Sequence, residues 1–246
     1  MAGHSKWKQI KHYKAATDAK RGALFTKLIR EITVAAKAGG GDPAANARLR
    51  TAVDAAKAKS MPKENIERAI KKGTGELEGE SYSELTYEGY GPGGVAIIIE
   101  ALTDNPTRTV AEVRHKFSKL GGNLGATGSV SYLFDRKGQI YLDAAGLDED
   151  RAMEFALEAG AEDLVREDDA YIVTTDPGSF HAVRSALEER KLAIEEAELA
   201  MVPKTTVRVE GPDAQSVVKL VEALEDLEDV QKVWANFDVD ESALVG

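Results

Sequence analysis

The sequence predicts an α+β protein in three parts: an N-terminal three-helix bundle followed by two α+β domains, one ferredoxin-like and inserted into the other. Three observations lead to this prediction. Apolar residues recur with a helical period up to about residue 75, strand-like and helical segments then alternate, and the order of elements between residues 137 and 202 is βαββαβ. The predicted domains are residues 1–76, residues 77–136 with 203–246, and residues 137–202.

The first part has a clear helical pattern. On a helical wheel, seven apolar residues of the first helix fall in one sector about 140° wide; they are Leu24, Phe25, Leu28, Ile29, Ile32, Ala35 and Ala36. The cations Lys20, Lys27, Arg30 and Lys37 fall on the opposite side. We therefore expect one face of this helix to pack and the other to offer charge.

Glycine and proline set the limits of the three helices. The run Gly39–Gly41 ends the first helix, because glycine tolerates the left-handed conformation of a helix cap. Asp42 and Pro43 predict the N-cap and first residue of a second helix, which runs to about Lys59. A third helix begins near Ser60 and ends at Gly73.

The remaining elements follow a linker at residues 74–83. The central segments are strands 85–90 and 95–102, a helix from the Asn105–Pro106 cap to Leu120, and strand 129–135. The βαββαβ set consists of strand 139–142, helix 148–159, strands 163–166 and 171–174, helix 178–190 and strand 194–201. Strand 205–209, helix 213–224 and strand 230–239 are too few to form a core, so we expect them to pair with the central segments.

Composition excludes several kinds of site. The chain has no cysteine, which rules out disulfides, thiolate nucleophiles and cysteine-ligated metals. Its four histidines form no HExxH motif, so neither a metal site nor a cofactor is expected. The longest apolar run, Val95–Ile99, is far too short to span a membrane. These features indicate a cytoplasmic protein without a membrane partner.

Charge is unevenly distributed along the chain. Residues 1–72 carry 17 Lys and Arg against 6 Asp and Glu, a net charge of +11. The remaining residues carry 15 against 36, a net charge of −21, which together give the overall −10. A basic module joined to acidic domains is typical of proteins that contact polyanions. Residues 143–200, with 17 acids and 5 bases, are the most acidic part.

The basic charge is densest between Gly3 and Arg30, where eight cations face one acid, Asp18, giving +7 over 28 residues. Cations neutralise phosphates, and aromatic rings among them can stack on unpaired bases. The candidate nucleic-acid-binding residues are Lys6, Trp7, Lys8, Lys11, His12, Lys14, Lys20, Arg21, Lys27 and Arg30. The alternatives are a solvated basic tail or a charged helix face without a partner.

Other motifs favour structural roles. Gly89–Gly94 matches GxGxxG, but the strand-like Val95–Ile99 follows it where a dinucleotide site requires a helix, so a strand-to-strand turn is favoured. Asp104 could be a catalytic carboxylate at a strand end, although a helix cap before Pro106 accounts for it. Arg108, His115 and Lys119 form either a second phosphate-contacting stripe or a solvated helix face. No catalytic residue is predicted.

Several stretches carry a resemblance to a known family. They include AGHSKW at 2–7, IKH at 10–12, DAKRG at 18–22, FTKLIREI at 25–32, GGDP at 40–43, LRTAV at 49–53, MPKENIERAIKKGTG at 61–75, YEGYGPGGVA at 87–96, TDN at 103–105 and RTVAEVRHKFSKLGGNLGATGSVSYLF at 108–134. By these stretches, which span nearly the whole chain, the protein resembles the YebC family of transcriptional regulators and, in mitochondrial relatives, translational activators. The resemblance implies three domains, a cytoplasmic location and engagement of nucleic acid, without a catalysed reaction.

Three functions follow as hypotheses. The first is a non-enzymatic, nucleic-acid-binding regulator of gene expression, similar to the DNA-binding transcriptional regulators of the YebC family, whose helical domain contacts phosphates. The second is a translation factor bound to ribosomal RNA, favoured by Trp7 and Tyr13, because unpaired RNA bases are free to stack on aromatic rings. The third, a nucleotide-processing enzyme that uses the glycine turns and Asp104, predicts turnover or tight binding of a mononucleotide. No small-molecule substrate is expected.

Overall fold

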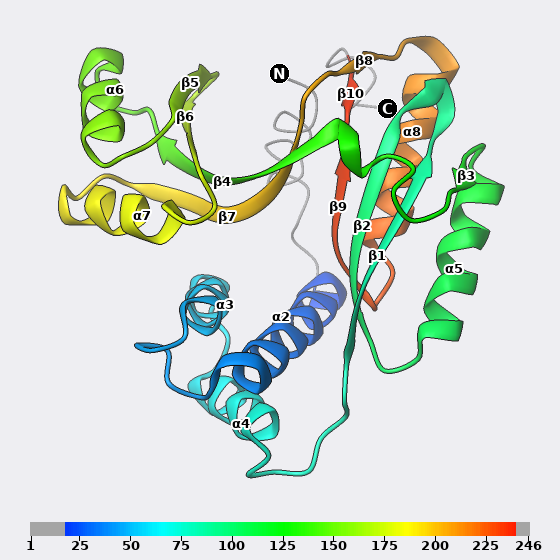
Figure 1. The fold of residues 1–246 in the computed structure, drawn as a ribbon, viewed down its shortest axis with the longest axis horizontal. Helices are drawn as coiled ribbons and strands as arrows, with labels where there is room; N and C mark the ends of the chain where they lie inside the picture. The colour runs from blue at the N-terminus through cyan, green and yellow to red at the C-terminus, as the bar shows by residue number, and fades with distance from the viewer. Residues whose placement is uncertain (1–17, 240–246) are drawn as a thin grey trace. The chain divides into compact units, whose positions relative to one another are not determined.

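The computed structural model describes residues 18–239, with side chains from residue 22 onward. The helical domain comprises α2 (Asp18–Gly39), α3 (Ala47–Ala58) and α4 (Lys63–Thr74) (Figure 1). Ile32, Leu49 and Ile66, one from each helix, meet in its core with the small residues of α3 and α4. Apolar residues on one face of each helix thus produce the predicted three-helix bundle.

The second helix begins later than predicted. Asp42–Ala45 forms a turn, in which the Asn46 backbone N–H donates to the Asp42 carbonyl at 2.9 Å. Asn46 is the true N-cap, since its Oδ1 accepts from the Leu49 N–H at 3.0 Å. Its Nδ2 also donates to the carbonyls of Ala35 and Gly40. Asn46 therefore caps α3 and also bonds to carbonyls at the end of α2. Asp42 lies four residues earlier, before the turn, and does not cap α3.

Gly73 does not end the third helix. It lies inside α4, where an added Cβ would meet the Thr33 carbonyl oxygen and lie 2.7 Å from the Ala36 Cβ. Gly75, at φ 83°, provides the left-handed cap. The glycine at 73 therefore permits α4 to approach α2 closely.

A four-stranded sheet with the order β3-β1-β2-β9 forms the centre of the second domain. Its strands are β1 (Ser83–Tyr90), β2 (Ala96–Thr103), β3 (Asn123–Leu124) and β9 (Val230–Ala235). Both α5 (Pro106–Lys119) and α8 (Gly211–Glu225) lie on the same side of this sheet (Figure 1). Their apolar residues form one core with the sheet. Because β9 pairs with β2, the C-terminal elements complete this domain, as predicted.

The connections of this domain differ from the predicted strands. Residues 129–133 are not a strand; they contain a 3₁₀ turn, Ser131–Leu133, and β4 begins only at Phe134. The predicted strand 230–239 is interrupted at Asn236, whose Oδ1 accepts from the Ala96 N–H at 2.7 Å. Beyond it, β10 (Phe237–Asp238) pairs in parallel with β8 (Val207–Arg208) in a separate two-stranded sheet.

The buried carboxylate of Glu88 explains why the segment after β3 is not a strand. It accepts backbone N–H groups of Gly128, Val130 and Ser131 at 2.7–2.8 Å. Burial disfavours the charged form, but these three donors outweigh it and hold the Glu88 pKa below its usual value. A side chain thus satisfies donors that a neighbouring strand would otherwise take.

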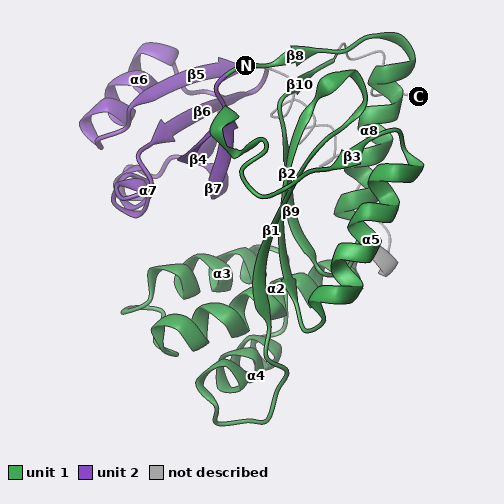
Figure 2. Ribbon diagram, turned by 45° about the vertical axis from the view of Figure 1, so that its right-hand side comes forward, with its two compact units in different colours: residues 1, 3–133, 205–246 green, residues 2, 134–204 purple. Residues whose placement is uncertain are grey.

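The inserted domain is a separate compact unit, residues 134–204 (Figure 2). It contains β4 (Phe134–Asp143), α6 (Glu149–Glu158), β5 (Asp163–Glu167), β6 (Ala170–Thr175), α7 (Phe180–Glu189) and β7 (Ile194–Pro203). The strand order β5-β6-β4-β7 with antiparallel pairing is the ferredoxin-like arrangement. Because Phe134 pairs with Pro203, this unit extends beyond the 137–202 predicted from the sequence.

Candidate nucleic-acid interface

Most of the predicted binding residues precede the part of the chain that the structure describes. Lys6, Trp7, Lys8, Lys11, His12 and Lys14 lie outside the described residues. Lys20 and Arg21 lie in α2, and only their backbone is described. The geometry of the predicted set can therefore be examined at Lys27 and Arg30.

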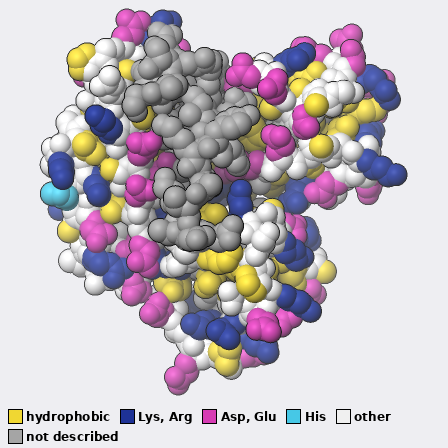
Figure 3. Space-filling view, turned by 180° about the vertical axis from the view of Figure 1, so that it is seen from behind, with side chains coloured by type: hydrophobic (Ala, Val, Ile, Leu, Met, Phe, Trp, Pro, Cys, Tyr) yellow, Lys and Arg dark blue, Asp and Glu magenta, His cyan; other side chains and the backbone are white. Residues whose placement is uncertain are grey.

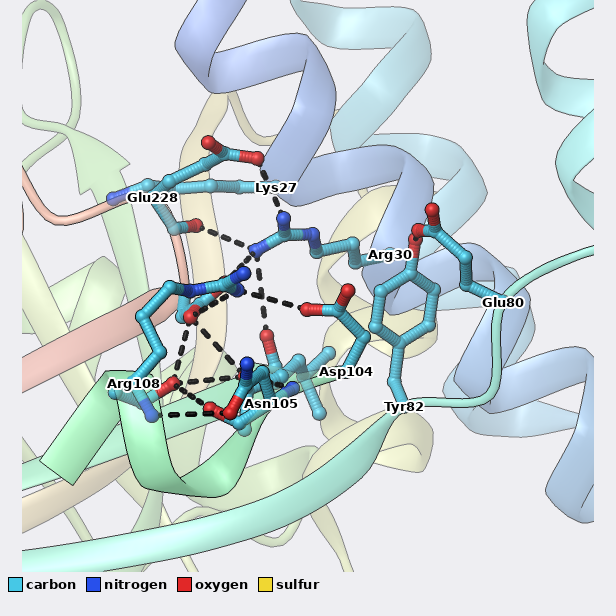
Figure 4. Close-up of polar contacts among 12 residues, drawn as sticks. Lys27, Arg30, Glu80, Tyr82, Asp104, Asn105, Arg108 and Glu228 are labelled. Carbon is cyan, nitrogen blue, oxygen red and sulfur yellow. Dashed lines mark hydrogen bonds and ion pairs between the residues drawn. The ribbon is translucent and has the colours of Figure 1, made fainter.

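Arg30 is buried, with 7% of its side chain exposed. Its Nη1 donates to the Asp229 carboxylate at 2.7 Å and to the Glu228 carbonyl at 3.0 Å. Its Nη2 contacts the Glu228 carboxylate at 2.6 Å, and its guanidinium lies 5.4 Å from the centre of the Tyr82 ring (Figure 4). All these partners belong to the chain itself, so the structure places the predicted phosphate-binding residue Arg30 in a buried network rather than on an exposed surface.

Asp229 is the centre of this network, with 2% of its side chain exposed. Besides Arg30, it accepts from Arg108 at 2.8 Å, from Thr109 at 2.7 Å and from Thr103 at 3.1 Å. Burial raises the free energy of its charged form, but the hydrogen bonds and the nearby guanidinium groups stabilise that form by more. The Asp229 pKa is therefore below its usual value.

Lys27 lies one turn before Arg30 on the same side of α2. Its Nζ donates to the carbonyl of Glu225 at the end of α8 at 2.5 Å, and the side chain is half-buried. The side of α2 predicted to offer charge therefore packs against the second domain through polar contacts. A helical wheel cannot separate a charged side facing water from one facing buried carboxylates and carbonyls.

Six exposed cations of the helical domain lie at the end of α3, in the turn that follows it and on α4. We call them the helical-domain cations; they are Lys57, Lys59, Lys63, Arg68, Lys71 and Lys72. Lys57 and Lys63 make only long, exposed contacts with acids, 3.8 Å and 3.4 Å. The other four make no ion pair within residues 18–239. Figure 3 shows Lys and Arg side chains, with acids between them, over the lower part of the view, where this domain lies.

The amphipathic pattern of α4 accounts for the four of these cations that lie on it, Lys63, Arg68, Lys71 and Lys72. Its apolar side buries Ile66 and Ala69 against α2 and α3, so the remaining positions must face water. Lys71 and Lys72 also lie in the last turn, where positive charge interacts favourably with the negative end of the helix dipole. Over the roughly 18 Å length of a twelve-residue helix, such a surface can contact several phosphates of a nucleic acid.

Two other arginines of this domain are engaged within the chain. Arg48 contacts Glu31 at 2.8 Å and Glu84 at 2.9 Å. Burial opposes its charge, but hydrogen bonds to the two carboxylates raise its pKa above the ordinary value. Arg50 donates to the carbonyls of Pro43 and Ala44. Both side chains therefore make contacts within the fold and are not counted among the helical-domain cations.

The motifs weighed against catalysis have structural roles. Gly89–Gly94 joins β1 to β2 through a 3₁₀ turn, Pro92–Gly94, and no helix follows it. Asn105 caps α5, its Oδ1 accepting from the Arg108 N–H at 3.1 Å. Asp104 pairs with the Arg108 guanidinium at 2.8 Å. Arg108 pairs with both Asp104 and Asp229, so it is engaged within the chain, which disfavours the alternative of a phosphate-contacting stripe with His115 and Lys119.

The described residues lack two further kinds of feature. Between residues 18 and 239, no group of three or more His, Asp or Glu side chains is placed to hold a metal ion. No helix in that range is long and apolar enough to cross a membrane.

No sequence pattern points to Asp229 as a site residue. It lies between α8 and β9 in an acidic stretch, Glu225–Asp229, whose other acids suggest a solvated turn. Its partners Thr103 and Thr109 are buried, and that pairing of separate segments is visible only in the fold.

The fold and these surfaces define a class of protein: a basic helical domain joined to two acidic α+β domains. Comparisons with known proteins agree with this class. Residues 5–76 match the family description "TACO1/YebC protein N-terminal domain", and residues 82–237 match "TACO1/YebC second and third domain". The chain belongs to the TACO1/YebC family.

Individual relatives cover nearly the whole chain. A protein from Gemmatimonas aurantiaca, named "Probable transcriptional regulatory protein", is 64% identical over 99% of both chains. A protein of the same name from Trichlorobacter lovleyi is 58% identical over 97% of this chain and 96% of its own. The crystal structure of a conserved hypothetical protein from Aquifex aeolicus matches with a TM-score of 0.85 and 52% identity, covering 92% of this chain and 93% of that one.

Proposed function

We propose that this protein is a nucleic-acid-binding regulator of gene expression that binds phosphates through its helical domain. The observation that carries the proposal is the exposed set Lys59, Arg68, Lys71 and Lys72, which makes no ion pair within the described residues and belongs to the same domain as the basic stretch Gly3–Arg30. Cations left unpaired by the fold are available to release counterions from a polyanion.

The names of the relatives support this proposal. The proteins from Gemmatimonas aurantiaca and Trichlorobacter lovleyi are both named probable transcriptional regulatory proteins. By analogy with them, duplex DNA is the first target. The acidic domains do not oppose binding, because charges farther apart than a Debye length, about 8 Å at physiological salt, are largely screened.

RNA is the second candidate target, as part of a ribosome-associated translation factor. Trp7 and Tyr13 lie among the lysines of the basic stretch, and aromatic rings stack on unpaired bases more readily than on paired ones. Co-sedimentation with ribosomes, compared with recovery on duplex DNA, separates the two. Duplex binding tighter than about 1 µM in physiological salt without ribosome association decides for DNA.

The proposal includes the absence of a catalysed reaction and a cytoplasmic location. The glycine turn, Asp104 and Asn105, the motifs considered for catalysis, are accounted for by turns, caps and ion pairs, which supports this part of the proposal. A panel of mononucleotides that produces neither turnover nor a thermal shift is the expected result. Turnover of any of them would contradict this part of the proposal.

Fluorescence anisotropy across a salt series tests the central proposal. If about five cations contact duplex DNA, the slope of log K against log salt is about −4.5, a loss of roughly 500-fold between 50 and 200 mM. The Lys71→Glu/Lys72→Glu variant removes two of them and flattens the slope by about 1.8. Lys8→Glu/Lys11→Glu should do the same.

The matched control reverses two exposed cations of the ferredoxin-like domain, Arg136→Glu/Lys191→Glu, which make no ion pair within residues 18–239. We expect the wild-type slope from it. If both double variants bind DNA equally weakly, the change in net charge alone explains the loss of affinity. That result would contradict a contact through the helical domain.

A further inference from the structure

The second domain, residues 77–133 with 205–239, contains seven cations. Three are engaged: Arg108 pairs with Asp229, Arg208 with Glu210 at 2.8 Å, and Lys232 lies 5.3 Å from the centre of the Trp234 ring. The other four make no ion pair within residues 18–239; they are Arg114, Lys116, Lys119 and Lys219. All four lie on α5 and α8, so the unpaired positive charge of this acidic domain is concentrated on its two helices.

Lys119 and Lys219 line one hollow of about 510 Å³, where α5 ends and α8 begins. Figures 1 and 2 both show these two helices on the same side of the central sheet. The other lining residues are Pro92, Gly93, Leu120, Gly121, Asp213 and Ser216. Lys116 lies three residues before Lys119, on the same side of α5.

The lining indicates which ligand this hollow can take. Two ammonium groups and the Ser216 hydroxyl can bind phosphate oxygens, and the only acid in the lining is Asp213. No aromatic ring lines the hollow, so a nucleobase would find no surface on which to stack. A phosphate group therefore fits better than a whole nucleotide.

The Arg30–Asp229 network connects this hollow to the helical-domain cations. Arg30 from α2 and Arg108 from α5 both bind Asp229, and the buried Arg30–Asp229 pair joins the helical domain to the second domain. Two cationic surfaces held on one body can contact the same polyanion, and the second contact then forms at a high effective concentration.

We propose that the Lys119–Lys219 hollow binds a backbone phosphate of the same nucleic acid chain that the helical domain binds. This inference rests on the function proposed above. The nucleic acid thus has two separate contacts on this protein, one on α4 and the basic stretch and one between α5 and α8.

The test is binding of the full chain to a labelled 30-nucleotide RNA across 50–500 mM salt, measured by anisotropy. In Lys119→Gln/Lys219→Gln, loss of one single-strand phosphate contact should flatten the slope of log K against log salt by about 0.7. If the variant and the wild type bind equally at 1 M salt, the variant then binds roughly eightfold more weakly at 50 mM. Asp213→Asn removes the opposing charge and should tighten binding. Thermal melting of each variant verifies that the fold is retained.

Arg114→Gln is the matched control. Arg114 is an exposed cation on the same helix and makes no ion pair with the residues that the structure describes. It lies five residues before Lys119, which places it about 140° away around α5. Wild-type binding by Arg114→Gln together with weakened binding by the lysine variant supports the proposal. Equal weakening in both, wild-type binding by the lysine variant, or no tightening by Asp213→Asn overturns it.

Two further outcomes separate this inference from the proposed function. If the lysine variant binds as wild type while Lys71→Glu/Lys72→Glu is weakened, the hollow is excluded and the helical-domain interface stands. If the wild-type protein binds neither RNA nor DNA, both fail. Titration with inorganic phosphate and with ADP tests whether the hollow binds a free phosphate ligand instead. If the lysine variant loses binding of these small ligands but not of RNA, the hollow does not bind a backbone phosphate.

Discussion

Arg30 and Asp229, 199 positions apart in the chain, form a 2.7 Å ion pair in which both side chains are almost completely buried. Arg30 comes from the first described helix and Asp229 from the turn before β9. The pair therefore joins the helical domain to the central sheet. Arg108, Thr103 and Thr109 satisfy the remaining lone pairs of the Asp229 carboxylate, which is the condition under which a buried ion pair is tolerated.

Removing one partner of this pair should destabilise the protein strongly. Asp229→Ala leaves the buried Arg30 guanidinium with only the exposed Glu228 carboxylate as a counter-charge, and we expect the free energy of unfolding to fall by about 3–5 kcal/mol. Arg48→Ala, which breaks more exposed ion pairs, should cost about 1 kcal/mol or less. Urea denaturation compares them. A similar small loss in both variants would show that the buried network does not join the domains.

The helical domain shows how much of the fold could be predicted. The apolar period placed all three helices, because Ile32, Leu49 and Ile66 lie on faces that bury apolar area whatever the partner. Helix ends were less predictable. Asp42–Pro43 and Asn46 both have the chemistry of a helix start, and only the contact of Asn46 with the Ala35 carbonyl of α2 decides between them.

The site was harder to predict than the fold. Arg30 belongs to a basic run, and the sequence alone does not show which cation of that run will face a buried carboxylate. The deciding residue, Asp229, comes from the opposite end of the chain. The helical-domain cations were foreseeable as a basic surface, since the apolar side of α4 fixes which side faces water.

Acid should destabilise the protein partly through Glu88. Its folded-state pKa is lowered, so its contribution to stability is present above the unfolded value, about 4.3, and is lost as the pH falls toward the folded value. As the pH falls below about 4, the free energy of unfolding of the wild type should therefore fall more steeply than that of Glu88→Gln. Denaturant titrations at each pH measure both slopes, and parallel curves would contradict this role.

At neutral pH, Glu88→Gln should also loosen the loop that Glu88 binds. A neutral amide cannot accept three N–H groups as a carboxylate does, and leaving buried donors unsatisfied costs about 1–3 kcal/mol. Hydrogen exchange of the Gly128, Val130 and Ser131 amides should accelerate in the variant. If these amides remain as protected as in the wild type while stability falls, the carboxylate does not hold this loop.

Gly73→Ala should destabilise the helical domain although alanine favours helices. The added methyl would meet the Thr33 carbonyl and Ala36, and such overpacking costs about 1–3 kcal/mol against a helix-propensity gain of about 1 kcal/mol. Gly22→Ala in α2 meets no atom within 4 Å and should be stabilising. Thermal denaturation of the two variants measures whether each substitution lowers or raises the melting temperature. A higher melting temperature for Gly73→Ala would contradict the close contact of α4 with α2.

The central claim, that cations at the front of the chain bind a polyphosphate, is tested most directly by replacing Lys6, Lys8, Lys11 and Lys14 with Gln in the full chain. Binding to labelled RNA and duplex DNA is then measured across a salt series, together with ribosome co-sedimentation. If these lysines contact four single-strand phosphates, the slope of log K against log salt flattens by about 2.8. Unchanged slopes and undiminished association with RNA, DNA and ribosomes would contradict the claim.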